Sequence, residues 1–100
     1  MNTLPIQISE MTIQQFCQQH QIRKLSLFGS VLRDDFSDRS DIDVLVEFLP
    51  GKTPGLAIVS MADELSNILG RSVDLRTPGD LSRYFRDRVL QEAMLIYEQD

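Results

Sequence analysis

Hydrophobic and polar residues follow one another along this chain with the spacings of short strands and amphipathic helices. Helical spacing of apolar residues predicts helices over residues 10–20, 56–69 and 80–97. Runs rich in β-branched residues predict strands over 24–28, 41–48 and 72–76. Ser9 suits an N-cap, and Gly70 suits the residue that ends a helix. This alternation by itself favours an α/β protein with a parallel sheet.

A Gly-Ser pair follows the first predicted strand, and two aspartates begin the second. Ten residues separate Gly29-Ser30 from Asp41-Ile42-Asp43. A glycine lets another group approach the backbone closely, because it has no Cβ. We expect Ser30 to cap a short helix through Arg33, whose free N–H groups would suit a phosphate. Arg33 would add a guanidinium to the same anion.

The two aspartates indicate a cation site. Residues i and i+2 of a strand point to the same face, so Asp41 and Asp43 would lie roughly 7 Å apart, with Ile42 turned away. Two neighbouring carboxylates resist ionising together, and Mg²⁺ removes that conflict because it binds carboxylate and phosphate oxygens. The alternative interpretation is an acidic strand start that simply faces solvent. Together with the Gly-Ser pair, the aspartates favour chemistry on a nucleoside triphosphate.

A third carboxylate, Asp74, lies in the last predicted strand between Val73 and Leu75. If this strand neighbours the one that begins at Asp41, Asp74 would reach the same metals and accept a proton from an attacking hydroxyl. It is equally consistent with an exposed aspartate paired with Arg76 or Arg71. The residues alone leave both possibilities open.

Composition restricts the number of domains, the class of partner and the cellular location that we expect for this protein. A chain of 100 residues with 42% hydrophobic residues predicts one domain with a thin core. The net charge of −5 argues against direct nucleic-acid binding. The single cysteine, Cys17, excludes an internal disulfide. The sequence has no apparent secretion signal and no stretch of membrane-spanning length, so we expect a cytoplasmic protein without membrane contact.

These motifs together resemble the minimal nucleotidyltransferase (MNT) family, a branch of the polymerase-beta-like nucleotidyltransferases. The resemblance spans roughly residues 22–98. It is carried by Leu27-Phe28-Gly29-Ser30, by the run from Ser40 to Phe48, and by Val73-Asp74-Leu75. It implies an α+β fold in which a small mixed β-sheet carries helices packed on it. It also implies that residues 1–100 form a single minimal nucleotidyltransferase domain.

The resemblance also implies roles for the motif residues. Gly29 and Ser30 would hold the triphosphate of ATP, Asp41 and Asp43 would bind two Mg²⁺ ions, and Asp74 would be the third catalytic carboxylate and metal ligand. Many relatives carry Arg-x-Arg-Gly directly after the Gly-Ser pair, whereas this chain has residues 31–34 as Val-Leu-Arg-Asp. Many MNT proteins are antitoxins that transfer AMP from ATP to a tyrosine of a HEPN ribonuclease toxin.

Two other functions stay open at this point. The protein could neutralise its partner by binding alone, or it could transfer nucleotides to a small molecule. One small domain leaves little surface to enclose an acceptor, which favours a partner protein that presents its own hydroxyl. Arg83, Arg86 and Arg88, in the last predicted helix, are expected to form a solvated face, with partner docking as the alternative.

Overall fold

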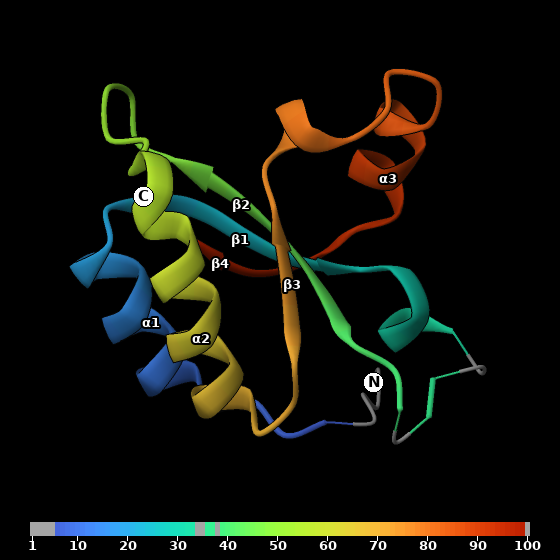
Figure 1. Ribbon diagram of the computed structural model, residues 1–100, viewed down its shortest axis with the longest axis horizontal. Helices are drawn as coiled ribbons and strands as arrows, with labels where there is room; N and C mark the ends of the chain where they lie inside the picture. The colour runs from blue at the N-terminus through green and yellow to red at the C-terminus, as the bar shows by residue number, and fades with distance from the viewer. Residues whose placement is uncertain (1–5, 34–35, 38, 100) are drawn as a thin grey trace.

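The computed structural model describes residues 6–33, 36–37 and 39–99, and the predicted loop over 34–40 lies partly outside these ranges. Seven regular elements and three short 3₁₀ turns follow one another along the chain (Figure 1). In chain order they are α1 (Glu10–Gln19), β1 (Ile22–Phe28), η1 (Gly29–Leu32), β2 (Ile42–Phe48), η2 (Gly55–Ala57), α2 (Ile58–Leu69), β3 (Val73–Arg76), η3 (Pro78–Asp80), α3 (Arg86–Glu92) and β4 (Met94–Glu98).

The four strands form one mixed sheet in the order β3-β2-β1-β4. β1 is antiparallel to both β2 and β4, whereas β2 and β3 are parallel. Helix α2 forms the crossover that a parallel pair requires. The mixed sheet confirms the architecture that the family resemblance implied and differs from the parallel sheet that alternation alone favoured.

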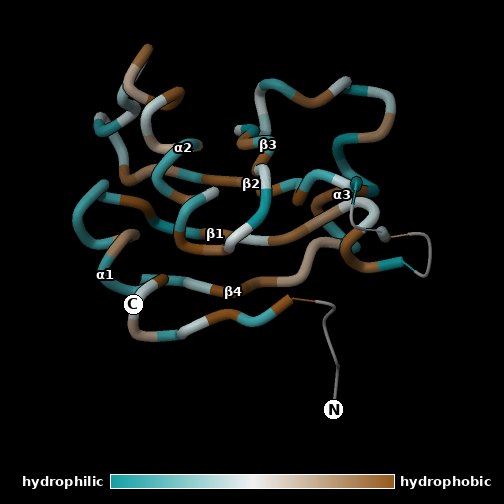
Figure 2. Tube along the Cα trace, turned by 60° about the horizontal axis from the view of Figure 1, so that its bottom comes forward, coloured by the Kyte–Doolittle hydropathy of each residue, from teal (hydrophilic) through white to brown (hydrophobic). Residues whose placement is uncertain are grey.

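The core lies between one face of the sheet and helices α1 and α2, while α3 lies on the other side of the sheet (Figure 1). The central strand β2 is largely hydrophobic along its length (Figure 2). Its alternate residues Ile42, Val44 and Val46 are fully buried in that core. Asp43 and Leu45 therefore belong to the opposite face, where α3 lies.

The predicted start of α1 and the predicted end of α2 are confirmed. The Ser9 hydroxyl accepts a hydrogen bond from the Thr12 amide at 3.3 Å, which caps α1. Gly70 ends α2 in the left-handed conformation, with φ of 72°. Cys17 is one of the buried residues of α1, and burial raises the pKa of its thiol to about 12. The thiol is therefore neutral at physiological pH.

The helix predicted over 80–97 is wrong at both ends. α3 covers only seven residues, Arg83 precedes it in a turn, and Ala93 is extended, with φ of −61° and ψ of 141°. The following residues form β4, which pairs with β1 through Leu27 and Met94. The free edge of β1 offers backbone hydrogen bonds that a longer helix could not use, and this tertiary pairing overrides the helical spacing.

In the described part of the chain, no helix has both the length and the apolar character needed to cross a membrane.

Candidate functional site

The predicted site residues meet where β1 ends and β2 and β3 begin. Asp43 is opposite Phe28 of β1 in the antiparallel pairing and beside Asp74 of β3 in the parallel pairing. The condition set for Asp74, that its strand neighbours the strand of Asp43, is therefore met. Asp41 directly precedes β2 and is exposed. Backbone pairing thus brings the three aspartates to one end of the sheet.

Gly29 explains why this motif needs a glycine after the first strand. Its φ is +75°, which an L side chain rarely adopts. A Cβ built on Gly29 would collide with the carboxylate of Asp43 and would lie 3.1 Å from its Cγ atom. Gly29 therefore allows the chain to turn sharply while the Asp43 carboxylate packs against the backbone.

The expected helix at Ser30 is only one turn of 3₁₀ helix, Gly29–Leu32. Ser30 is not its cap. The N-cap position is Phe28, and no side chain forms a capping hydrogen bond there. Ser30 lies within the turn, and its carbonyl accepts a hydrogen bond from the Arg33 amide at 2.9 Å.

A cavity of about 420 Å³ opens beside this turn. Its lining combines Gly29 and Arg33 with apolar side chains and with one acidic residue of α3, Glu92. The positive charge of Arg33 also acts on Asp43, where it partly opposes the rise that burial causes in the pKa of that carboxyl. An anion bound at the turn would therefore have a guanidinium on one side and the aspartates nearby.

Electrostatics at Asp43 favour a cation. Burial raises the pKa of the Asp43 carboxyl above its usual range, and the charges of Asp74 and Asp41 raise it further. Arg76 and Arg33 oppose this shift without cancelling it. Two like charges disfavour the ionised form of this carboxyl, and a bound cation would stabilise that form, as was expected from the sequence.

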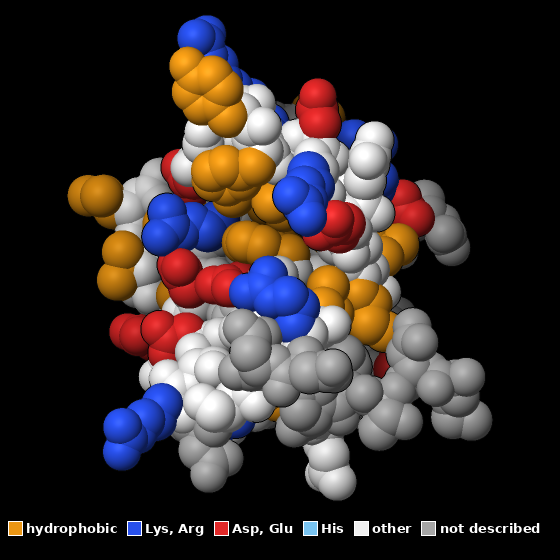
Figure 3. Space-filling view, turned by 90° about the vertical axis from the view of Figure 1, so that its right-hand side faces the viewer, with side chains coloured by type: hydrophobic (Ala, Val, Ile, Leu, Met, Phe, Trp, Pro, Cys, Tyr) orange, Lys and Arg blue, Asp and Glu red, His pale blue; other side chains and the backbone are white. Residues whose placement is uncertain are grey.

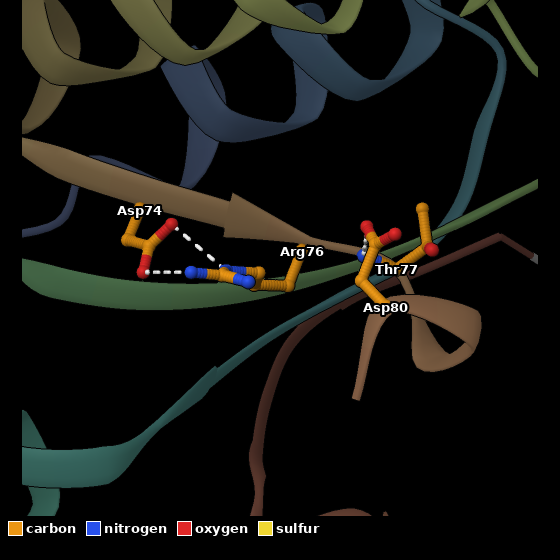
Figure 4. A network of polar contacts seen from close by, with 4 residues as sticks. All are labelled: Asp74, Arg76, Thr77 and Asp80. Atoms are coloured by element: carbon orange, nitrogen blue, oxygen red, sulfur yellow. Dashed lines mark hydrogen bonds and ion pairs between the residues drawn. The ribbon is translucent and has the colours of Figure 1, made fainter. Parts of the chain in front are cut away.

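Asp74 is held by an arginine in this conformation. Arg76 binds its carboxylate with two hydrogen bonds, Nε to Oδ1 at 3.0 Å and Nη2 to Oδ2 at 3.2 Å (Figure 4). Among the described residues, no three acidic, histidine or cysteine side chains are grouped closely enough to hold a metal ion. Both interpretations of Asp74 thus describe part of its surroundings: it neighbours Asp43 and it pairs with Arg76. Its role as a metal ligand stays a prediction.

A second cavity, of about 240 Å³, lies over these residues. Asp43, Asp74 and Arg76 form one side of it, and the segment after β3 forms the other. That segment is shaped by Asp80, whose carboxylate accepts the Thr77 amide at 3.0 Å (Figure 4). This backbone hydrogen bond also lowers the pKa of Asp80. Phe85 completes the cavity, with half of its surface exposed.

Sequence reasoning missed Arg71, which holds the chain before Asp41. Its Nη2 donates to the Ser37 and Ser40 carbonyls, the latter at 2.8 Å, and its guanidinium lies 4.6 Å from the centre of the Phe36 ring. An arginine directly after a helix-ending glycine was the only sequence signal, and it did not indicate a partner 31 residues earlier. Arg71 thereby positions the residue that precedes Asp41.

Arg71→Ala should loosen this segment and reduce catalysis without unfolding the protein. Because a misplaced catalytic group costs up to 10²-fold and Asp41 is only one of three carboxylates, we expect transfer to fall roughly tenfold. We expect the free energy of unfolding to drop by about 1 kcal/mol for the lost charged hydrogen bonds. Single-turnover rates and urea denaturation measure the two effects, with Arg39→Ala as an exposed control in the same segment. Unchanged transfer would refute the positioning role.

Comparisons with known proteins agree with this geometry. The family model "Polymerase beta, Nucleotidyltransferase" matches residues 11–100. A Methanocaldococcus jannaschii protein with the provisional name protein adenylyltransferase is 40% identical over 75 residues, covering 75% of this chain and 80% of the relative. Protein adenylyltransferase MntA of Thermococcus cleftensis is 30% identical over 76 residues, covering 75% of each.

Solved structures share the fold. One described provisionally as a minimal nucleotidyltransferase has a TM-score of 0.70 at 32% identity and covers 85% of this chain and 86% of its own. A toxin–antitoxin structure with AMP-PNP has a TM-score of 0.72 at 21% identity, covering 93% and 76%. A Shewanella oneidensis complex of a tri-AMPylated HEPN toxin with its MNT antitoxin has a TM-score of 0.63 at 22% identity, covering 90% and 70%. This chain belongs to the polymerase beta nucleotidyltransferase family.

Proposed function

We propose that this chain is a Mg²⁺-dependent protein adenylyltransferase that acts as the antitoxin of a toxin–antitoxin pair. It transfers AMP from ATP to a tyrosine hydroxyl of a HEPN ribonuclease toxin and so neutralises the toxin. The observation that carries this proposal is the register that aligns Asp43 with Asp74 beside Gly29. Supporting it, relatives of this chain are named protein adenylyltransferases, and structures of the same fold are described with AMP-PNP and with an AMPylated HEPN toxin.

The residues present fit a divalent cation. Asp41 and Asp43 supply carboxylate oxygens, the ligands that Mg²⁺ prefers, and the repulsion that raises the pKa of Asp43 is the conflict that a cation relieves. Asp74 would join them once its carboxylate leaves Arg76. Bound there as two ions, Mg²⁺ would neutralise the charge that develops on the reacting phosphate.

One group of residues in the site would bind phosphates, and another residue would accept the proton. Gly29, Ser30 and Arg33 would hold the β- and γ-phosphates, which leaves the α-phosphorus near Asp43. The tyrosine oxygen would attack the α-phosphorus, the bond from that phosphorus to the β-phosphate bridging oxygen would break, and pyrophosphate would leave. Asp74 would accept the tyrosine proton. Most of the acceleration would come from positioning and charge neutralisation.

The size of the cavities at the site supports a protein acceptor. We propose that residues 1–100 act as one minimal nucleotidyltransferase domain, with no nucleic acid as substrate. The two cavities at the site are about 420 and 240 Å³, room for a nucleotide and for one side chain that enters from outside. A cytoplasmic location fits both ATP as the substrate and a ribonuclease as the partner.

Intact-mass analysis of a candidate HEPN toxin tests the proposal. Incubation with this chain, ATP and Mg²⁺ should add one or more AMP groups to that protein, and the Asp41→Ala/Asp43→Ala double variant should add none. Continued neutralisation by the double variant, with no mass gain from the wild type, would instead support an antitoxin that acts by binding alone. AMP on an added small-molecule alcohol would support the third function.

Arg76→Gln should strengthen cation binding. The change removes a positive charge beside Asp43 and frees the Asp74 carboxylate. An exposed ion pair is worth up to about 1 kcal/mol, so we expect the Mn²⁺ affinity to rise by up to about fivefold. Calorimetry or Mn²⁺ electron paramagnetic resonance on the ATP-free protein measures this. Arg83→Gln, with the same charge change in the exposed turn before α3, should leave the affinity unchanged. Weaker Mn²⁺ binding by Arg76→Gln would contradict the competition.

A further inference from the structure

The face of the sheet that carries Asp43 and Asp74 continues away from the catalytic end as an open groove. α1 and α2 cover the other face, whereas η3 lies against β2 at the catalytic end of this face and α3 lies beside the groove (Figure 1). Leu45 follows Asp43 by two residues, so it lies on the same face, and it pairs in register with Arg76 of β3. The groove and the 240 Å³ cavity over Asp43 and Asp74, called the catalytic cavity below, are therefore parts of one surface.

The groove is apolar at its centre and has a volume of about 410 Å³. Leu45 forms its floor and is 2% exposed. Leu90 of α3 and Leu95 of β4 line its sides and remain 41% and 47% exposed. Hydrophobic side chains lie among charged ones on the side of the molecule that carries α3 and η1 (Figure 3). Leu90 and Leu95 therefore leave apolar surface exposed beside the buried Leu45, and an apolar side chain of a partner would cover this surface.

A negative charge lies at the end of the groove that is farther from the catalytic cavity. Glu47 lines the groove, and the described residues give it no ion pair. Lys24, its neighbour across the strands, pairs with Glu98 of β4 at 3.5 Å instead. A basic side chain of a partner would therefore find an available carboxylate at this end.

We infer that this groove docks the acceptor-bearing helix of the partner protein, an inference that rests on the proposed function. The strand sets the spacing, because Leu45 and Glu47 lie about 7 and 13 Å from Asp43 along β2. A helix rises 1.5 Å per residue, so it would place an apolar residue about four or five positions from the acceptor tyrosine. It would place a lysine or arginine about eight or nine positions from that tyrosine, opposite Glu47. Docking in the groove thus delivers the hydroxyl to Asp43 and Asp74.

Binding of the HEPN toxin that gains AMP in the intact-mass experiment, or of a co-expressed HEPN toxin if none does, tests the groove apart from catalysis when it is measured by calorimetry without ATP. Leu95→Glu and Glu47→Lys should each weaken binding at least tenfold. The matched control is Leu56→Glu, because Leu56 is 91% exposed and lies outside the groove in η2, and it should change affinity less than twofold. Wild-type affinity of these variants for ATP with Mg²⁺ shows that their folds are intact. Exchanging a basic residue of the partner helix for glutamate should restore binding to Glu47→Lys.

The outcomes separate this inference from the proposed function. Groove-dependent binding without AMP transfer by the wild type would support the docking surface and defeat the transferase. AMP transfer with wild-type affinity in both Leu95→Glu and Glu47→Lys would support the transferase and overturn the docking surface. Failure of the wild type to bind the HEPN protein would overturn the docking surface as well.

Discussion

Asp43→Asn should reduce AMP transfer by about 10³-fold while the fold stays intact. Asp43 occupies the centre of the site, between Phe28 and Asp74 in the two strand pairings, and its carboxylate packs against Gly29. Asparagine keeps the size of this side chain but removes the charge that a cation and a developing phosphate charge require. Single-turnover transfer to the HEPN protein measures the loss. Asp63→Asn, an exposed position on α2, is the matched control and should transfer at the wild-type rate.

The same substitution should raise the melting temperature at pH 7. The pKa of Asp43 is raised in the folded state, so the folded protein binds this proton more tightly than the unfolded chain does. Stability is therefore lost as the pH rises from the ordinary aspartate value of 3.8 through the raised one, and asparagine avoids that loss. The gain in melting temperature should shrink as the pH falls toward 3.8, which calorimetric scans in metal-free buffer can follow. A lower melting temperature at pH 7 would contradict the electrostatic account of the site.

Gly29→Ala should reduce transfer by about 10²-fold, because displacing a catalytic group by about 1 Å costs that much. The new methyl group would meet the Asp43 carboxylate, so Asp43 or the turn must move. The left-handed backbone at φ of +75° adds a cost of about 1–2 kcal/mol in stability. Transfer rates and urea denaturation separate the two effects.

Gly51→Ala is the matched control for the backbone cost. Gly51 has the same φ of +75°, but a Cβ there would meet nothing within 4 Å. It should lose a similar amount of stability and keep wild-type transfer. If both variants transfer equally well, the contact between Gly29 and Asp43 is not what the motif requires.

Several local features were predictable because they depend on neighbouring residues in the chain. The hydroxyl of Ser9 caps α1 and Gly70 ends α2, and each depends on the chemistry of the cap residue itself. The two-residue period of β2 buries Ile42 and turns Asp43 to the opposite face. The position of Asp43 on the sheet face away from the core therefore follows from alternation.

Other features depended on segments far apart in the sequence. The last four residues of the predicted helix, 94–97, became part of β4 because the edge of β1 was available to pair with them. The segment at Ser30 formed an uncapped 3₁₀ turn in place of the expected helix, and Gly29 in this turn packs against Asp43 of β2. Arg71 and Arg76 acquired their roles only when folding placed the Ser40 carbonyl and the Asp74 carboxylate within reach.

The chain's own order of residues determined the chemistry that is possible here: a glycine after one strand, paired aspartates on the next and a single aspartate on a third. Only the tertiary structure decided how these groups meet. The register of β2 with β1 and β3 sets Asp43 between Gly29 and Asp74. Arg76 binds the Asp74 carboxylate, so Asp74 faces a positive charge in this conformation. The physical reason is that dihedral preferences and side-chain period act over a few residues, whereas strand pairing and charge interactions depend on which distant segments come together.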